Sequence, residues 1–473
     1  MNRQSSFIRR SQKTMEKPAA KPFGVRDQVG YMFGDMAGSF VNLLIDAYFL
    51  TFCTYVLNID PKWMGSLFLV ARLWDAFNDP MIGSFPDRWQ IGKSGDKFKP
   101  YVRIAMIPLA ISALLCFADV SSFSSALKHV WVAAAYVIYG MSYTGTSMPY
   151  GSMAAVITND PVERTKLSRA RSIGGTIVGI GALSLVPQFV FDSTGNVSPK
   201  GFFGVAIVFG ICSILCYLVL LTLTTERVRQ PRGEKQKFNY GKVIKGVLHN
   251  RQMLGVMLAS VGSLLYITGN SQLGSYLYKE YYHAPKVLTL VSLISIPVMV
   301  ICFPLIPKLS QKFGKRAVIL FASGYNLVIS TILFLIPIPN VYLYLILSTL
   351  AVSGQTGFTM LVWAFVTDCV DYQEYKTGER SDGSLYSIYT FSRKIGSTLA
   401  STLASYGLAA IGFVSGAAVQ SEAFAVNVRA LCTAIPVITC ILELVGIGLI
   451  YNLNKERTEK MYSELNARRG QAQ

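Results

Sequence analysis

The chain has 473 residues, of which 52% are hydrophobic and only 15% are charged, and its mean hydropathy is +0.40. Such an apolar composition excludes a soluble protein of this size and indicates a protein that crosses a membrane several times. The formal net charge of +18 would suit a nucleic-acid partner. The positions of the basic residues, described below, argue against that class.

Apolar runs of about 20 residues, the length that crosses roughly 30 Å of hydrocarbon, predict twelve transmembrane helices. Their approximate limits are 35–57, 62–85, 101–118, 130–157, 171–191, 202–224, 252–279, 286–307, 317–337, 341–368, 386–414 and 428–452. Polar residues interrupt the first, second, seventh and eleventh of these runs, so the limits of those four are the least sharply defined.

Most of the 44 Lys and Arg residues fall in segments on the side of the N-terminus. Those on the opposite side are Lys62, Lys128, Lys200, Lys279, Lys286 and Arg429, and those within spans are Arg72, Arg103, Arg393 and Lys394. By the positive-inside rule, this asymmetry predicts a multi-pass protein of the cell inner (cytoplasmic) membrane with both termini in the cytoplasm. It also accounts for the positive charge without a nucleic-acid partner.

A basic segment at 225–251 separates the sixth span from the seventh and divides the chain into two halves. We predict a cytoplasmic N-terminal segment (1–34), a six-helix bundle (35–224), a cytoplasmic central loop (225–251), a second six-helix bundle (252–452) and a cytoplasmic tail (453–473). Glycine-containing basic turns follow the second and eighth spans, at 83–93 and 307–316, as two repeats would require. These turns are either ordinary solvated loops or gates in which charges such as Asp87 and Arg88 pair across helix ends.

The sequence predicts neither an enzyme nor a cofactor. The eight cysteines lie mostly within spans and the three histidines fall at span ends or in loops. No group of them has the spacing of a metal site, so we expect no metal beyond a possible Na+. No phosphate-binding GxxxxGK[ST] motif follows a strand, which argues against ATP hydrolysis.

The second span carries several charges inside an apolar run. Arg72, Asn78 and Asp79 lie three or four residues from Asp75, so all four share one helix face. A charge at mid-bilayer costs roughly 2.5–3.5 kcal/mol, so these side chains need a function or a partner. Carboxylate and amide oxygens suit a hard cation, and paired carboxylates can hold a proton. The alternative is an internal ion pair of Arg72 with Asp75, which would leave Asp79 unpaired.

The first and eleventh spans also carry polar side chains. In the first, Asp35, Asn42 and Asp46 lie on one side of the helix. Asp35 could be an ordinary acid of the first helical turn, whereas Asp46 lies deeper and favours a role in the interior. In the eleventh, Arg393 and Lys394 need buried partners, and the carboxylates of the first two spans are the economical choice.

The fourth span repeats aromatic and hydroxyl side chains at helical spacing. They are Tyr136, Tyr139, Tyr143, Thr146 or Ser147, and Tyr150. Aromatic faces stack on the C–H faces of a sugar, and neighbouring hydroxyl groups bond its hydroxyls. Such stripes also serve helix packing alone, so the pattern leaves both interpretations open.

Four motifs together resemble one family of transporters. They are LFLVARLWDAFNDPMIG at 67–83, MPYG at 148–151, TNDPVER at 158–164 and VDYQEYKTG at 370–378. In this order they resemble the glycoside-pentoside-hexuronide:cation symporters of the major facilitator superfamily, which include the melibiose carrier. The resemblance extends over nearly all of residues 30–452.

This resemblance implies an all-α membrane protein with the major facilitator fold, in which twelve transmembrane helices form two six-helix bundles. It implies a sugar site between the bundles and transport by alternating access. The family's cation site corresponds here to Asp75, Asp79 and Asn78, with Thr390 nearby. A family lysine close to both cation and sugar corresponds to Lys394.

Two positions depart from the pattern of melibiose carriers. Ser39 and Ser147 stand where those carriers have aspartates that bind galactoside hydroxyls, and the additional Arg393 makes an acidic sugar such as a hexuronide a candidate. The predicted substrate-binding residues are Ser39, Asp46, Tyr143, Ser147, Tyr150, Arg393 and Lys394. The predicted coupling or gating residues are Arg72, Asp35, Asp87, Arg88, Asp371 and Arg380.

We therefore predict a secondary active symporter, coupled to H+ or Na+, that imports a glycoside, pentoside or hexuronide and acts as a monomer in the lipid bilayer. One alternative is a cation-coupled carrier of lysolipids or other amphiphiles. A second is a membrane sugar sensor that does not transport. A membrane-embedded transferase fits least, because the sequence has no additional catalytic loop or metal motif.

Overall fold

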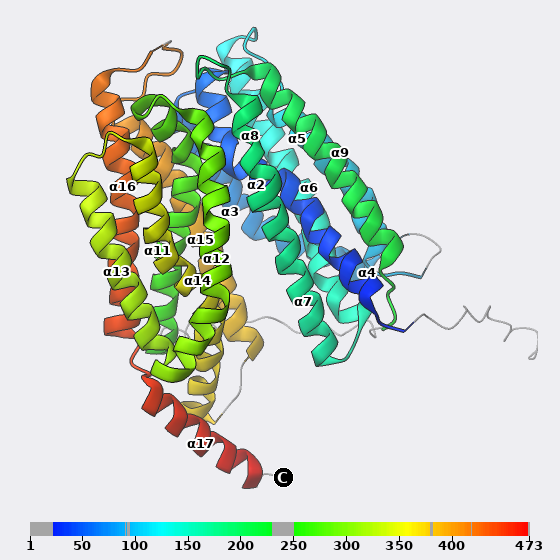
Figure 1. The fold of residues 1–473 in the computed structure, drawn as a ribbon. Coiled ribbons are helices and arrows are strands. Elements are labelled where there is room, and N and C mark those ends of the chain that lie inside the picture. Colours follow the sequence, from blue (N-terminus) through cyan, green and yellow to red (C-terminus); the bar gives the residue numbers. More distant parts are fainter. Residues whose placement is uncertain are drawn as a thin grey trace, which may run out of the picture.

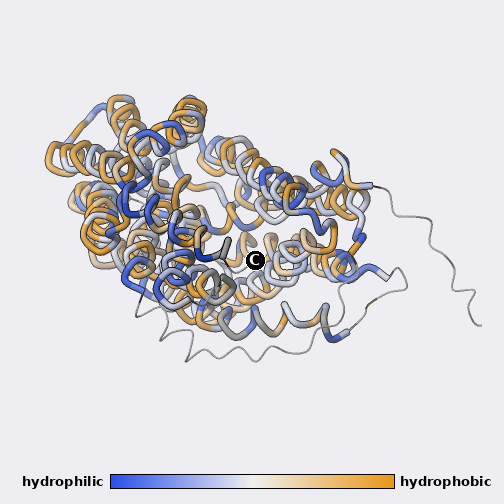
Figure 2. Tube along the Cα trace, turned by 90° about the horizontal axis from the view of Figure 1, so that it is seen from below, coloured by the Kyte–Doolittle hydropathy of each residue, from blue (hydrophilic) through white to orange (hydrophobic). Residues whose placement is uncertain are grey.

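The computed structural model describes residues 22–89, 91, 95–228, 250–378, 382–417 and 419–471. The regular elements in these ranges are helices, and the β-structure found there is a single isolated bridge between Phe191 and Val197. The helices form two bundles that lie side by side, one from each half of the chain (Figure 1). Figure 2 views them from the α17 side, and apolar residues run along the helices of both bundles.

The N-terminal bundle contains six rods. They are α2 (Val25–Tyr55), α3 (Pro61–Gly83), α5 (Lys99–Cys116), α6 (Ser125–Ile157), the continuous rod α7 (Pro161–Thr176), η1 (Ile177–Ala182) and α8 (Leu183–Val190), and α9 (Pro199–Leu223). The short helix α4 (Phe85–Arg88) follows α3. The first rod begins at Val25, before the predicted limit of 35, because its polar first turns are held by contacts described below.

The C-terminal bundle repeats this arrangement. Its rods are α11 (Arg251–Tyr276) with η2 (Leu277–Tyr281), η3 (Pro285–Val287) with α12 (Leu288–Phe313), α13 (Lys315–Leu335), α14 (Val341–Thr377), α15 (Asp382–Ala410), and α16 (Glu422–Glu443) with η4 (Leu444–Ile450). A last helix, α17 (Lys455–Gln471), lies against the end of the bundle and buries Met461 and Leu465. The sequence predicted only a tail at this position.

The buried share of each helix distinguishes central helices from peripheral ones. Within the described residues, nine helices are long and apolar enough to cross a membrane. In the most apolar stretch of α2, 72% of the residues are buried, against 17% in the rod of η3 and α12, so α2 is central and α12 peripheral. The rods outside that set of nine are α3, α6 and α15, which carry the polar stripes predicted from the sequence. Their polar faces are sheltered because these three helices meet at the cavity described below.

The two bundles touch at the face opposite the one that carries α4 and α17. Thr54 Oγ1 and the Tyr276 hydroxyl are 2.6 Å apart, and the Tyr55 hydroxyl donates to Glu280 Oε1 at 2.8 Å. Lys279 pairs with Glu280 at 2.5 Å and lies over the Tyr55 ring. Figure 1 shows the ribbons of the two bundles diverging toward the α4 and α17 face. In this state, therefore, the bundles are in contact at the face opposite α4 and α17.

We predict that Tyr55→Phe weakens this contact between the bundles. The variant loses the hydrogen bond to Glu280 but keeps its ring against Tyr276 and Phe413. A hydrogen bond to a charged group is worth about 1.5–3 kcal/mol, so local opening should become about tenfold more frequent. Backbone hydrogen exchange at residues 54–59 and 276–284 measures this opening.

The control for Tyr55→Phe is Tyr282→Phe, because the Tyr282 hydroxyl donates to the Ile338 carbonyl within the C-terminal bundle. Equal exchange in the two variants at residues 54–59 would contradict the predicted role of Tyr55.

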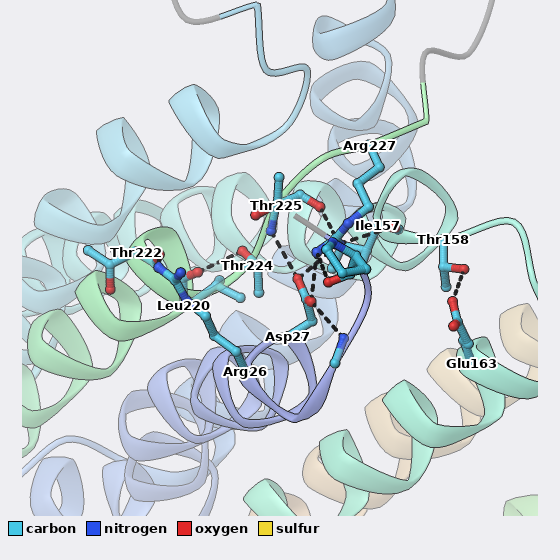
Figure 3. Close-up of polar contacts among 12 residues, drawn as sticks. Arg26, Asp27, Ile157, Thr158, Glu163, Leu220, Thr222, Thr224, Thr225 and Arg227 are labelled. Carbon is cyan, nitrogen blue, oxygen red and sulfur yellow. Dashed lines mark hydrogen bonds and ion pairs between the residues drawn. The ribbon is translucent and has the colours of Figure 1, made fainter. Parts of the chain in front are cut away.

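At the other face, polar contacts fasten the start of α2 to the segment after α9 (Figure 3). Arg227 binds both carboxylate oxygens of Asp27, at 3.0 and 2.8 Å, and Asp27 is only 2% exposed. The backbone N–H groups of Arg227 and Val228 donate to the Val156 carbonyl at 2.7 and 2.8 Å. Nearby, Thr158 donates to Glu163 at 2.5 Å. These contacts tie together the ends of α2, α6 and α9.

We predict that Arg227→Met lowers the free energy of unfolding by about 3 kcal/mol, because it leaves the Asp27 carboxylate buried without a cation. The control is Lys460→Met, which removes a solvent-exposed partner of Glu464 and should cost below about 1 kcal/mol. Denaturation in detergent micelles provides the measurement. Similar losses in both variants would show that Asp27 does not depend on this pairing.

Candidate functional site

A cavity of about 110 Å³ whose lining includes several charged side chains lies where α3, α6 and α15 meet. Its lining comprises Ala71, Arg72, Trp74, Asp75 and Asp79 from α3, Tyr136, Val137, Tyr139, Gly140, Tyr143, Thr144, Ser147 and Met148 from α6, and Lys394 from α15. Because α3 and α6 belong to one bundle and α15 to the other, the cavity lies between the two halves of the chain. Such a position suits a ligand that both bundles must contact.

An ion pair joins the two bundles at this cavity. The Lys394 ammonium contacts Asp79 Oδ2, and the Thr144 hydroxyl donates to Asp79 Oδ1 at 2.8 Å. The Asp79 side chain is 11% exposed, whereas that of Lys394 is 51% exposed. The buried carboxylate is thus held from both sides, and its cationic partner has space to move. The sequence predicted a carboxylate of the first two spans as the partner of Lys394, and the structure confirms this pairing.

A second cluster centres on Arg72. Its guanidinium lies 3.5 Å from Asp75 Oδ2 and 3.7 Å from Asp46 Oδ1. Asn42 donates to Asp46 Oδ2 at 2.9 Å, and the Tyr139 hydroxyl donates to Asn42 Oδ1 at 2.7 Å. The pairing of Arg72 with Asp75 is therefore only part of a network that links α2, α3 and α6.

The charges of the two clusters do not balance. Three carboxylates, from Asp46, Asp75 and Asp79, face two cationic side chains, from Arg72 and Lys394. If all five are ionised, the connected group carries one net negative charge in the membrane interior. An uncompensated charge is costly there, so the group favours the binding of one monovalent cation.

Asn78 lies beside these carboxylates in α3 and is 1% exposed. Both polar atoms of its amide, Oδ1 and Nδ2, are buried without a hydrogen-bond partner. Burying an unpaired amide costs free energy, so this side chain has unused capacity to bind a ligand. Thr390, the fourth predicted cation-site residue, is partly buried in α15.

The aromatic stripe of α6 divides into two parts. Tyr139 stacks on Tyr143 with ring centroids 6.0 Å apart, and both rings line the cavity together with Ser147. Tyr150 lies outside the lining, because it stacks on Tyr31 at 4.6 Å and donates its hydroxyl to the Tyr31 carbonyl at 2.8 Å. In this state Tyr150 packs α6 against α2.

Three other predicted substrate or coupling residues lie away from the cavity lining. Asp35 pairs with Arg171 at 2.9 Å, and Ser39 lies one turn further along the same helix. Arg393 lies over the rings of Trp363 and Tyr389, at 5.7 and 6.0 Å from their centroids. Arg393 therefore has partners in its own bundle, whereas the sequence predicted a carboxylate of the first two spans.

Two of the remaining predicted gating residues, Arg88 and Asp371, lie toward the α4 and α17 face. Arg88 is exposed at the end of α4, and the structure does not describe the side chain of its neighbour Asp87. Asp371 is 5% exposed near the end of α14. Arg380 lies outside the described residues. The gate predicted from these four residues therefore stays a prediction.

The sequence alone did not single out several residues that bind or neighbour the predicted site residues. Thr144 falls one residue after Tyr143, and Arg171 is the first residue of the fifth predicted span. Asp368 pairs with Lys315 at 2.5 Å and accepts from the Tyr462 hydroxyl at 2.8 Å, although it lies only three residues before Asp371 in an apolar run. Asp368 could have been noticed because it lies three residues from Asp371 and therefore shares its helix face.

The two bundles and the charged cavity between them define a polytopic membrane transporter. The family model described as MFS/sugar transport protein matches residues 30–455, and the chain belongs to this family. The predicted fold class and the resemblance to sugar–cation symporters of the major facilitator superfamily are confirmed, and the protein is a sugar transporter and not an enzyme.

The relatives agree with this assignment. The chain is 30% identical to an uncharacterized symporter, YjmB, of Bacillus subtilis (strain 168), over 96% of this chain and 98% of that protein. It is 29% identical to a putative sulfoquinovose importer of Escherichia coli (strain K12), over 96% of each chain. The fold is similar to that of a bacterial homolog of the human lysosomal transporter Spinster, in an inward-facing and unoccupied conformation. The TM-score is 0.66 and the sequence identity 13%, and the match covers 94% of this chain and 99% of that one.

We predict different effects for two tyrosines of α6. Tyr143→Phe removes a hydroxyl from a ring that lines the cavity, so the KM for sugar uptake should rise about two- to tenfold, the equivalent of one hydrogen bond. Tyr150→Phe removes the bond to Tyr31 and should lower the melting temperature with the KM unchanged. Uptake kinetics and thermal denaturation of both variants provide the measurements, and an equal rise in KM would contradict the division of the stripe.

Proposed function

We propose that this sugar transporter is a symporter, coupled to H+ or Na+, that imports a glycoside, pentoside or hexuronide across the cell inner membrane by alternating access. Both termini lie in the cytoplasm, and a single copy of the chain is the transporting unit. The observation that carries the proposal is the unbalanced charge of the cluster formed by Asp46, Asp75, Asp79, Arg72 and Lys394.

The coupling ion binds at Asp75 and Asp79. One monovalent cation neutralises the net negative charge of the cluster, and the unpaired amide oxygen of Asn78 supplies a further ligand. Thr390 completes the proposed site from α15. One cation that crosses 100 mV releases about 2.3 kcal/mol, enough for roughly fifty-fold accumulation of a neutral sugar.

Coupling follows from competition for Asp79. Lys394 and the incoming cation are both attracted to the same carboxylate, so cation binding weakens the ion pair and releases Lys394 toward the cavity. The ammonium group is then free to donate hydrogen bonds to sugar hydroxyls. Each ligand thereby raises the affinity for the other, as reciprocal linkage requires.

The sugar lies against the stacked rings of Tyr139 and Tyr143, with the Ser147 hydroxyl as a nearby bonding partner. Ser39 and Asp46 lie on the neighbouring helix α2, and Tyr150 lies further along α6. All three join the site in other conformations of the cycle. The name of one relative, a putative sulfoquinovose importer, supports an acidic sugar as one candidate substrate. Arg393 is the predicted cationic contact for such a sugar, provided that it leaves Trp363 and Tyr389.

The proposed orientation makes the present state open toward the cytoplasm. The bundles are fastened by Tyr55 and Glu280 at the opposite face, which is then the external one. Asp35 and Arg72 transmit the coupling between helices through their ion pairs. Asp87, Arg88, Asp371 and Arg380 act on the cytoplasmic side when the bundles close there.

We predict that Asp79→Asn abolishes uphill sugar accumulation while sugar exchange and sugar binding survive. The amide keeps the size of the side chain but carries no charge to attract the coupling cation. Uptake into proteoliposomes with an imposed pH gradient, and separately with a Na+ gradient, measures accumulation and identifies the ion.

The control for Asp79→Asn is Asp192→Asn. Asp192 lies in the exposed loop between α8 and α9, so this variant should accumulate sugar like the wild type. Wild-type accumulation by Asp79→Asn under both gradients would refute the proposed coupling site.

A further inference from the structure

A second buried carboxyl group lies inside the C-terminal bundle, away from the cavity between the bundles. Glu443 is fully buried, at 0% exposure, and is the last residue of α16 before the π-helix η4. It is absent from the cavity lining and has no role in the transport mechanism proposed above. Its surroundings come from α11, α13 and α14, so it lies at the centre of one bundle.

The hydrogen bonds around Glu443 are incomplete. Ser323 of α13 donates to Glu443 Oε2 at 2.6 Å. The Gln355 side chain of α14 also lies next to the Glu443 carboxyl group. Gln355 Nε2 donates instead to Ser263 Oγ of α11 at 2.6 Å. The second oxygen of each side chain, Glu443 Oε1 and Gln355 Oε1, is buried without a partner. Each of these two neighbouring side chains thus has an acceptor oxygen that receives no hydrogen bond.

No cationic side chain pairs with Glu443 among the residues that the structure describes. The titratable groups that face it are Cys440, on its own helix, and Tyr266 of α11. Ser323 and Gln355, which face it from α13 and α14, do not titrate. Arg316, at the start of α13, donates to the carbonyls of Ile447 and Gly448 in η4. An ionised carboxylate here would be buried without compensation, and such groups take up a proton instead.

The backbone that follows Glu443 packs closely against α11. A Cβ atom added at Gly446 would lie 2.5 Å from the Gly255 carbonyl oxygen, so η4 and α11 are in direct backbone contact. The π-helix η4 begins directly after Glu443 and ends the rod of α16.

We propose that Glu443 is a proton-binding site of the C-terminal bundle, distinct from the coupling site, and that it holds a resident proton that Oε1 donates to Gln355 Oε1. Protonation turns one of the two unpartnered acceptors into a donor and so gives both oxygens a partner. It also removes the buried charge. The neutral acid then links α13, α14 and α16 through Ser323 and Gln355. This proposal does not depend on which sugar or ion is transported.

Infrared spectroscopy of the purified, reconstituted full chain tests the proposal. At neutral pH the wild type should show the C=O stretching band of a protonated, buried carboxylic acid, and Glu443→Gln should remove it. The matched control is Glu280→Gln, which should leave the band intact because Glu280 pairs with Lys279 as a carboxylate. A wild type without the band, or a band that persists in Glu443→Gln, would overturn the proposal.

A second variant tests the assignment where Glu443→Gln fails to fold. Ser323→Ala removes the donor to Glu443 Oε2, so it should shift the carboxylic-acid band without abolishing it. An unchanged band in Ser323→Ala would assign the acid to another residue.

Transport and stability give independent readouts. Because glutamine resembles the neutral acid in shape, Glu443→Gln should accumulate sugar to within about twofold of the wild type. A folded Glu443→Gln that binds sugar but does not accumulate it would show that the proton leaves during transport, which overturns a resident proton.

A group protonated in the folded state loses its stabilising effect as the pH rises. The melting temperature of the wild type should therefore fall relative to that of Glu443→Gln between the pKa of an unfolded glutamate, about 4.3, and the pH at which Glu443 loses its proton in the folded state. Equal slopes over this range would contradict the proposal.

Discussion

The ion pair of Lys394 with Asp79 is the interaction on which the arrangement of the site depends. It joins α15 to α3 and hence one bundle to the other, at a depth where an unpaired charge is costly. In this state the lysine is the cation that compensates the buried carboxylate. The coupling proposed above rests on this compensation, because an ion that replaced the lysine at Asp79 would also change the contact between the bundles.

The same cost of buried charge explains how the helices are distributed. The rods of high hydropathy, such as α9 and α12, carry the surfaces that lipid can cover, whereas α3, α6 and α15 turn toward one another around the cavity. At the end of the N-terminal bundle where α2 begins, the charge is compensated by a local ion pair between Arg227 and Asp27. Inside the C-terminal bundle no cation is paired with Glu443 among the described residues, and a proton is the simplest compensation.

Much of the fold follows from the sequence because lipid imposes a length and a polarity on every crossing segment. The apolar runs predicted the rods of both bundles, and the spacing of Arg72, Asp75 and Asp79 predicted a shared helix face, where all three line the cavity. Helix ends were predicted less well. The first rod begins at Val25 because Asp27 is paired with a residue near the end of α9, and α17 forms because it packs on the C-terminal bundle. Both depend on contacts between segments that are distant in sequence.

The sequence alone determined which segments cross the membrane, that several of them carry charge, and which helix faces those charges share, because these properties depend on neighbouring residues and on the helical period. Only the tertiary structure decided the partners. Lys394 reaches Asp79, whereas its neighbour Arg393 lies over Trp363 and Tyr389. Tyr143 faces the cavity, whereas Tyr150 packs on Tyr31. Adjacent or equally spaced residues diverge in this way because their surroundings depend on how each helix is rotated and packed against helices from other parts of the chain.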